Sequence, residues 1–146
     1  MMTRMQTVTL VALRIAVGWF LLYQGIIAII TPSWSILPMI KNAHTFSPFY
    51  ASIGNSSTAA LAGYVITGLF ILVGALLILG LFVRIAALLG IGLMLFFYFP
   101  LLAFPKIGNS GYVVNEHLII ALTLLLLYFM RAGEYFSLGK IIGSRN

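Results

Sequence analysis

The chain has 146 residues, of which 62% are hydrophobic and 7% are charged, and its mean hydropathy is +1.15. A water-soluble domain of this size could not cover so much apolar side chain with polar surface, so the composition excludes that class and predicts a protein embedded in the lipid bilayer. The net charge of +6 comes from basic residues scattered singly between apolar blocks, a pattern that indicates membrane topology and argues against a nucleic-acid partner.

Four apolar runs are long enough to cross a bilayer core, which takes about 20 residues of helix. We expect the first run to be a retained helix, because it exceeds the usual ~7–15 apolar residues of a signal peptide and lacks a clear cleavage site. The third run stops before Pro105, and the fourth starts after Asn115, a good helix cap. The sequence therefore predicts an all-α fold in which residues 1–146 form a single transmembrane domain, a four-helix bundle with spans at 7–30, 58–82, 85–104 and 116–131.

The basic residues are divided unequally between the two sides of such a bundle. The loops on the side away from the two termini hold only Lys41 and Lys106. Because Lys and Arg concentrate on the cytoplasmic side, we expect a multi-pass protein of the cell membrane with both termini in the cytoplasm. The long loop of residues 31–57 then lies outside, and its aromatic residues are interpreted as interfacial anchors or as part of a lid. The side that holds both termini collects Arg4, Arg84, Arg131, Lys140 and Arg145.

One arginine falls within the first predicted span, where the bilayer resists a charge. Arg14, Gly18 and Gly25 lie within about 40° of one another on a helix, so we expect this face to look into the bundle. Two interpretations of the arginine stay open. Its side chain extends to lipid phosphates at the near interface, or it forms an ion pair with the carboxylate near the end of the fourth span. The second interpretation predicts a structural charge cluster of Arg14, Arg84, Arg131 and Glu134.

A second polar set is expected near the outer ends of the spans. If the spans are antiparallel neighbours, these side chains lie at one depth and line a single pocket. A quinone suits such a pocket, because its ring enters lipid while its carbonyl oxygens and its reduction need hydrogen-bond donors and protons. The set comprises Glu116 and His117 as catalytic proton-transfer groups, with Tyr23, Gln24, Tyr98 and Asn115 as quinone or substrate contacts.

The alternative interpretation of this set is structural. Asn115 and Glu116 cap a helix, and His117 makes a local hydrogen bond at headgroup depth. The chain has two histidines and no cysteine, so no metal, haem or flavin site is visible, and a quinone is the one cofactor that the pattern suggests. Glycines at 63, 68, 74, 80 and 90 indicate tight helix packing and offer docking surfaces for other helices.

Three segments resemble, in order, the helical segments of the DoxX/DoxD-like membrane family. They are "ALRIAVGWFLLYQGI" (12–26), "LFILVGALLILGLFVRIAALLG" (69–90) and "NEHLIIALTLLLLYFMRAGEYFSLG" (115–139). The resemblance rests on Arg14 and the glycines of the first segment, on Arg84, on His117 and on the ending that closes at Gly139. The family often has Asp at that last position, where this chain has Gly and so lacks the carboxylate.

The resemblance implies a four-helix membrane fold. For the DoxD branch it also implies membership of a thiosulfate:quinone oxidoreductase, in which thiosulfate at the outer face gives electrons to a membrane quinone. Lys41, His44 and Lys106 would then attract the anion at the outer face. Because no electron-carrying cofactor site is visible, a partner subunit in the membrane is expected. The alternative function is a non-catalytic structural or anchoring subunit of a larger membrane complex, so whether the chain is an enzyme stays open.

Overall fold

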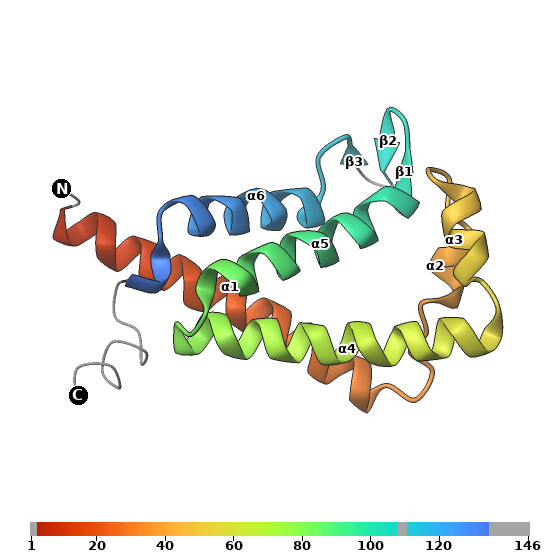
Figure 1. The fold of residues 1–146 in the computed structure, drawn as a ribbon. Coiled ribbons are helices and arrows are strands. Elements are labelled where there is room, and N and C mark those ends of the chain that lie inside the picture. Colours follow the sequence, from red (N-terminus) through yellow and green to blue (C-terminus); the bar gives the residue numbers. More distant parts are fainter. Residues whose placement is uncertain (1–2, 108–110, 135–146) are drawn as a thin grey trace.

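The computed structural model describes residues 3–107 and 111–134, which form mainly helices (Figure 1). The longer helices in this part of the chain are α1 (Arg4–Ile30), α4 (Ser56–Leu79), α5 (Val83–Leu101) and α6 (Glu116–Phe129). Shorter elements are α2 (Leu37–Lys41), α3 (Ser47–Ile53), the 3-10 helix η1 (Ala132–Glu134), and the strands β1 (Leu102–Ala103), β2 (Lys106–Ile107) and β3 (Gly111–Tyr112).

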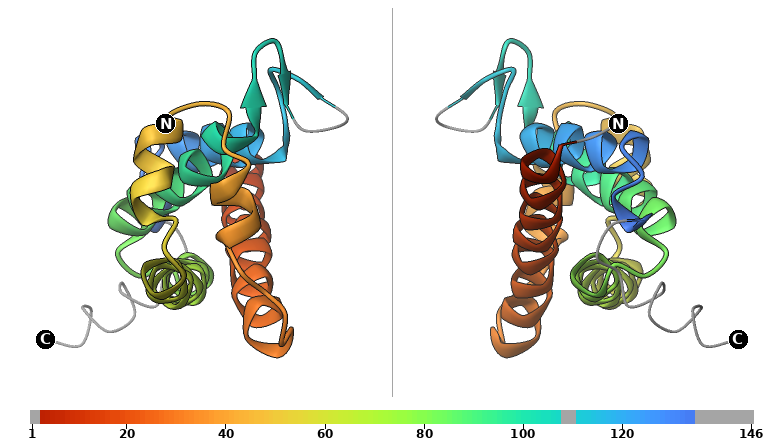
Figure 2. Two further views of the ribbon diagram at one scale, coloured as in Figure 1. Left: turned by 90° about the vertical axis from the view of Figure 1, so that its right-hand side faces the viewer. Right: turned by 90° about the vertical axis from the view of Figure 1, so that its left-hand side faces the viewer.

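The longer helices pack mainly as two pairs, α1 with α4 and α5 with α6, and α4 also packs along α5. α1 runs obliquely to α4, as the end-on views show (Figure 2). The start of α1 and the end of α6 lie at one end of the molecule, and α2, α3 and the strands lie at the other (Figure 1). The chain therefore has a loop-covered end and an end where helices α4 and α5 are joined by a tight turn.

Glycine permits the close approach of α1 to α4, as expected for helices that associate in lipid. A Cβ added at Gly74 would lie 2.5 Å from the backbone nitrogen of Leu22 and 2.7 Å from the carbonyl oxygen of Gly18. The predicted tight packing is confirmed at this position. At Gly68 no described residue of the chain packs closely, because nothing lies within 4 Å of an added Cβ and that surface faces outward.

Gly80 has a different role from the packing glycines. It adopts a left-handed conformation with φ 72°, and the N–H of Leu81 donates to the carbonyl of Leu76 at 3.0 Å. This is the hydrogen bond of a Schellman ending, which needs a residue without a Cβ penalty. The glycine therefore ends α4 rather than bringing two helices together.

Three of the described helices, α1, α4 and α5, are long and apolar enough to cross a membrane. α6 has 14 residues, which at ~1.5 Å per residue is shorter than the ~30 Å bilayer core. The fourth span and the cytoplasmic placement of both termini therefore stay predictions.

The third predicted span was placed at 85–104, but α5 ends at Leu101. Loop residues donate hydrogen bonds to carbonyl groups at the end of this helix and just after it. The N–H of His44 donates to the carbonyl of Pro100 at 3.1 Å, and the hydroxyl of Thr45 donates to that of Leu102 at 2.6 Å. Residues after the helix then pair in a small antiparallel sheet of order β1-β2-β3 that projects beyond α5 (Figure 1), an addition to the all-α fold expected from the sequence.

The loop between α1 and α4 covers the bundle end rather than lying loosely over it. Ile36, Ile40 and Tyr50 are buried, and the Tyr50 hydroxyl donates to the carbonyl of Phe96 at 2.9 Å. Burial raises the pKa of the Tyr50 phenol, because the ionised form would lose its water. This loop therefore closes the end of the bundle at which the site described next lies.

Candidate functional site

A small cavity lies between the helices beside the start of α6, and we call it the His117 cavity. Its volume is about 100 Å³. Its described walls come from α1, the following loop, α4, α5 and α6. The aromatic residues Phe20, Trp34, Phe70 and Phe97 and the polar residues Gln24, Glu116 and His117 line it, together with Met94 and Ile120.

The first turn of α6 fixes the orientation of the histidine. The side-chain oxygen of Asn115 accepts the N–H of Leu118 at 3.1 Å, so the cap predicted at this residue is confirmed. This bond turns the amide nitrogen of Asn115 towards Nδ1 of His117, at 3.3 Å. An amide nitrogen only donates, so Nδ1 accepts and the neutral imidazole carries its proton on Nε2. Capping and site geometry are therefore one arrangement rather than alternatives.

The His117 ring is 20% exposed and stacks on Phe97, with ring centres 6.0 Å apart and planes inclined by 19°. Glu116 is 69% exposed, and its Oε1 lies 4.0 Å from Nδ1 of the same histidine. If Nδ1 gained a proton, its bond from the Asn115 amide would be lost and the carboxylate would become the natural acceptor. The pair therefore links a half-buried imidazole to a carboxylate in contact with the surroundings.

The structure brings together Gln24, Glu116 and His117 from the polar set predicted to line one pocket, with Asn115 behind them. Tyr23 is exposed and does not line the cavity, because adjacent helical residues point about 100° apart. Tyr98 is buried, and its hydroxyl donates to the carbonyl of Val113 at 2.7 Å. The shared-pocket expectation therefore does not hold for either tyrosine.

The basic residues expected to attract an anion all lie at the loop-covered end. Lys41 is the last residue of α2, His44 follows it, and Lys106 lies in β2. All three residues are exposed, and none lines the His117 cavity. They add positive charge to the molecular surface near the cavity rather than to its interior.

At the other end, Arg14 is 1% exposed, and its guanidinium donates to the carbonyl of Ala132 at 2.7 Å. The expected inward-facing orientation is confirmed, and the alternative in which the side chain extends to lipid phosphates is wrong. Arg84 and Arg131 are exposed and lie nearby on α5 and at the end of α6. The side chain of Glu134 and residues 135–146 lie outside what the structure describes, so the ion pair with this carboxylate stays a prediction.

Sequence reasoning did not identify the aromatic walls of the site. Phe97 belongs to the run "FFYF" (96–99) at the outer end of the third predicted span, the same depth as the start of the fourth. That shared depth was the available signal. Trp34 was considered only as an interfacial anchor, yet it borders the cavity. Within the described ranges, no three His, Cys, Asp or Glu side chains group closely enough to hold a metal ion.

A model of the DoxX family matches residues 9–102, which is more than half of the chain. The chain belongs to the DoxX family. No curated protein and no solved structure matches it significantly. The DoxX match covers Gln24, Trp34 and Phe97 and ends before α6, so Asn115, Glu116 and His117 lie outside it. As a DoxX protein with three helices in its described part that can span a bilayer, it is a membrane protein in contact with lipid.

Proposed function

We propose that this DoxX protein is the membrane subunit of a quinone-linked oxidoreductase of the thiosulfate:quinone type, and that the His117 cavity receives the quinone head ring. One observation carries the proposal. A half-buried histidine of defined tautomer, stacked on an aromatic ring and next to an exposed carboxylate, faces a small aromatic-walled cavity among apolar helices.

The size of the cavity favours a single ring. Its volume of about 100 Å³ is below the ~300–1,000 Å³ of clefts that enclose a whole drug-sized ligand. A quinone enters with its ring only, and its isoprenoid tail stays in lipid. The aromatic walls pack on the ring, and the Gln24 amide and the Nε2–H of His117 supply donors for its carbonyl oxygens.

The chemistry assigned to this chain is proton delivery. A quinone bound here takes up two electrons and two protons to become a quinol, and two thiosulfate ions supply the electrons as their sulfurs join in tetrathionate. Nδ1 of His117, which faces Glu116, takes up a proton, and the imidazolium so formed gives its Nε2 proton to a carbonyl oxygen of the quinone. Glu116 is exposed and receives protons from water. The electrons arrive through a partner subunit, and Lys41, His44 and Lys106 draw thiosulfate to the same end by charge.

Binding can be tested through the tryptophan that borders the cavity. The chain has two tryptophans, so Trp19→Phe leaves Trp34 as the sole fluorophore. In that background, a short-tailed quinone should quench the fluorescence, and His117→Leu should weaken quenching by about tenfold in quinone concentration because a buried donor is lost. His44→Leu, at the other histidine, should leave the quenching curve unchanged. Equal quenching in both histidine variants would refute the placement of the ring.

Turnover tests the proton pathway separately. In membranes that contain the complete complex, Glu116→Gln should lower thiosulfate-dependent quinol formation by about a hundredfold, the lower range for loss of a general acid–base. Glu134→Gln is the matched control, since these are the two acidic residues of the chain. Unchanged turnover in Glu116→Gln would remove the catalytic role of this residue.

A second candidate function is that of an anchoring subunit, and one observation favours it. Gly68 faces open space on α4, between the exposed apolar residues Val65 and Leu72. Such a face suits close docking of another membrane helix. Gly68→Leu should then reduce the size of the assembly on native gels, whereas Gly92→Leu on α5, which is equally open, should not. An unchanged assembly would count against docking at this face.

A further inference from the structure

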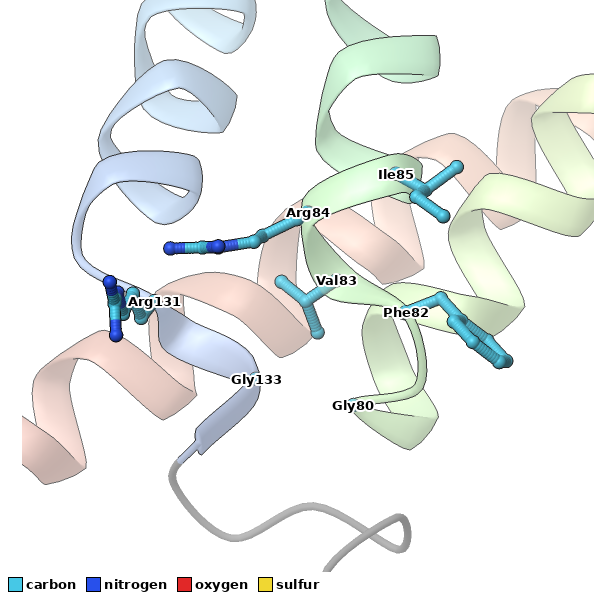
Figure 3. A pocket seen from close by; sticks show the side chains of 7 residues that line it. All are labelled: Gly80, Phe82, Val83, Arg84, Ile85, Arg131 and Gly133. Carbon is cyan, nitrogen blue, oxygen red and sulfur yellow. The ribbon is translucent and has the colours of Figure 1, made fainter.

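A second hollow, which we call the arginine groove, lies at the opposite end of the molecule from the His117 cavity. It forms where α4 ends, α5 begins and α6 ends (Figure 3). Its described walls are the turn 80–85, apart from Leu81, together with Arg131 and Gly133. Its volume of about 380 Å³ falls within the ~300–1,000 Å³ range typical of ligand clefts.

Two guanidinium groups line the groove. The Arg84 guanidinium carbon lies 5.9 Å from the centre of the Tyr128 ring, which directs this side chain from α5 towards α6. The Arg131 side chain, at the end of α6, lies on the side of the groove towards which Arg84 points (Figure 3). None of the described residues that line the groove is acidic. Paired guanidinium groups bind phosphate oxygens well, because their planar N–H donors match that geometry.

The rest of the groove is apolar and open to the surroundings. Phe82 is 72% exposed and Ile85 is 57% exposed, while Val83 is buried beneath them. A small soluble anion would make no use of these side chains, whereas acyl chains would pack on them. The groove also lies at the end of two apolar helices of membrane-spanning length, which is the depth of lipid headgroups.

The wall of the groove is held in place from inside the protein. The buried Arg14 guanidinium bonds to the carbonyl of Ala132, the residue between Arg131 and Gly133. Gly133 lies close to α5, since an added Cβ would be 3.1 Å from Cβ of Val83. The groove is therefore formed before a ligand arrives, which lowers the cost of binding.

We infer that the arginine groove binds the phosphate of an anionic phospholipid, with the guanidinium groups of Arg84 and Arg131 on the phosphate and the acyl chains along Phe82 and Ile85. An anionic headgroup is favoured over a zwitterionic one, because a choline ammonium would bring a third positive charge to the two arginines. This inference does not depend on the quinone proposal, which concerns the other end of the molecule.

Native mass spectrometry of the full-length chain in neutral detergent tests the inference, with equal amounts of phosphatidylglycerol and phosphatidylcholine added. The wild-type chain should retain phosphatidylglycerol preferentially. Each neutralised arginine should weaken retention by about fivefold, so Arg84→Gln with Arg131→Gln should lose it by about twenty-fivefold. Arg4→Gln, an exposed basic residue at the same end, should retain the lipid. Equal retention of both lipids by the wild type, or full retention by the double variant, would overturn the inference.

Two further measurements use the wild-type chain and so do not depend on folding of a variant. Inorganic phosphate should not displace phosphatidylglycerol; displacement would make this a site for soluble anions and end the lipid assignment. Phosphatidylglycerol with a photoreactive acyl chain should label the peptide that contains residues 80–85. Labelling confined to other segments would contradict the placement of the acyl chains.

Discussion

The pair Gly74 and Gly68 on α4 allows a matched test of how the helices associate. In Gly74→Ala, the new methyl group would meet only backbone, with Leu22 N at 2.5 Å, Gly18 O at 2.7 Å and Leu22 Cα at 2.8 Å. No rotamer change relieves such contacts, so α1 and α4 must separate. Overpacking costs about 1–3 kcal/mol, and alanine returns up to ~1 kcal/mol through helix propensity. Because backbone atoms cannot move aside as a side chain can, we take the overpacking cost near the upper end of its range. The expected net loss in unfolding free energy is then about 2 kcal/mol.

In Gly68→Ala, nothing lies within 4 Å of the new methyl group, so only the propensity term remains. This variant should match or exceed the wild type by up to ~1 kcal/mol. Unfolding by a denaturing detergent in mixed micelles, followed by circular dichroism, compares the two variants directly. Equal stability of Gly74→Ala and wild type, or equal losses in both variants, would refute the reasoning that backbone contact sets the α1–α4 distance.

Three further predictions concern polar contacts. Arg14→Met should lower unfolding free energy by about 1.5–3 kcal/mol, because a buried charged hydrogen bond is lost, and should speed proteolysis after α6. Tyr50→Phe should cost about 1 kcal/mol near neutral pH, whereas exposed Tyr64→Phe should cost nothing. Burial raises the pKa of Tyr50 in the folded state. The contribution of Tyr50 to stability is therefore full below the unfolded-state pKa of ~10 and is lost as pH rises through the folded-state pKa. In melting experiments above pH ~10, the wild type should lose more stability than Tyr50→Phe. Asn115→Asp should keep the helix cap yet convert neutral His117 to the Nδ1–H tautomer, which ¹⁵N NMR of labelled histidine detects; an unchanged tautomer would contradict the assignment.

The apolar helices could be predicted from the sequence because the thickness of the bilayer sets their length independently of tertiary contacts. The cap at Asn115 could be predicted because it is a local interaction between a side chain and the first turn of its own helix. The inward face of Arg14 followed from helical periodicity, since its glycine neighbours at 18 and 25 mark the side that packs on α4. Each of these features depends on a few adjacent residues or on one helix.

The site was predicted only in part, because its members depend on how each helix is rotated. Tyr23 and Gln24 share a depth, and the packing of Gly25 against Ile71 on α4 decides which of them faces the cavity. Tyr98 could have faced the cavity too, but its hydroxyl donates a hydrogen bond to the carbonyl of Val113, in the turn after β3. The two-residue strands give no periodicity that a sequence pattern could reveal.

The two proposed ligand sites lie at opposite ends of α6, and this separates their tests. With 14 residues at ~1.5 Å each, the helix spans about 20 Å, so neutralising the arginines cannot act directly on a ring beside His117. An indirect effect would need α6 to slide along α5. Leu124 of α6 opposes that motion because it packs closely against Gly90 of α5, where an added Cβ would lie 2.8 Å from the Cδ1 atom of Leu124. We therefore expect the arginine double variant to lose phosphatidylglycerol while quinone quenching of Trp34 fluorescence is unchanged. Loss of both in the folded variant would show that lipid at one end sets the position of α6 at the other, and the two sites would then have to be treated as coupled.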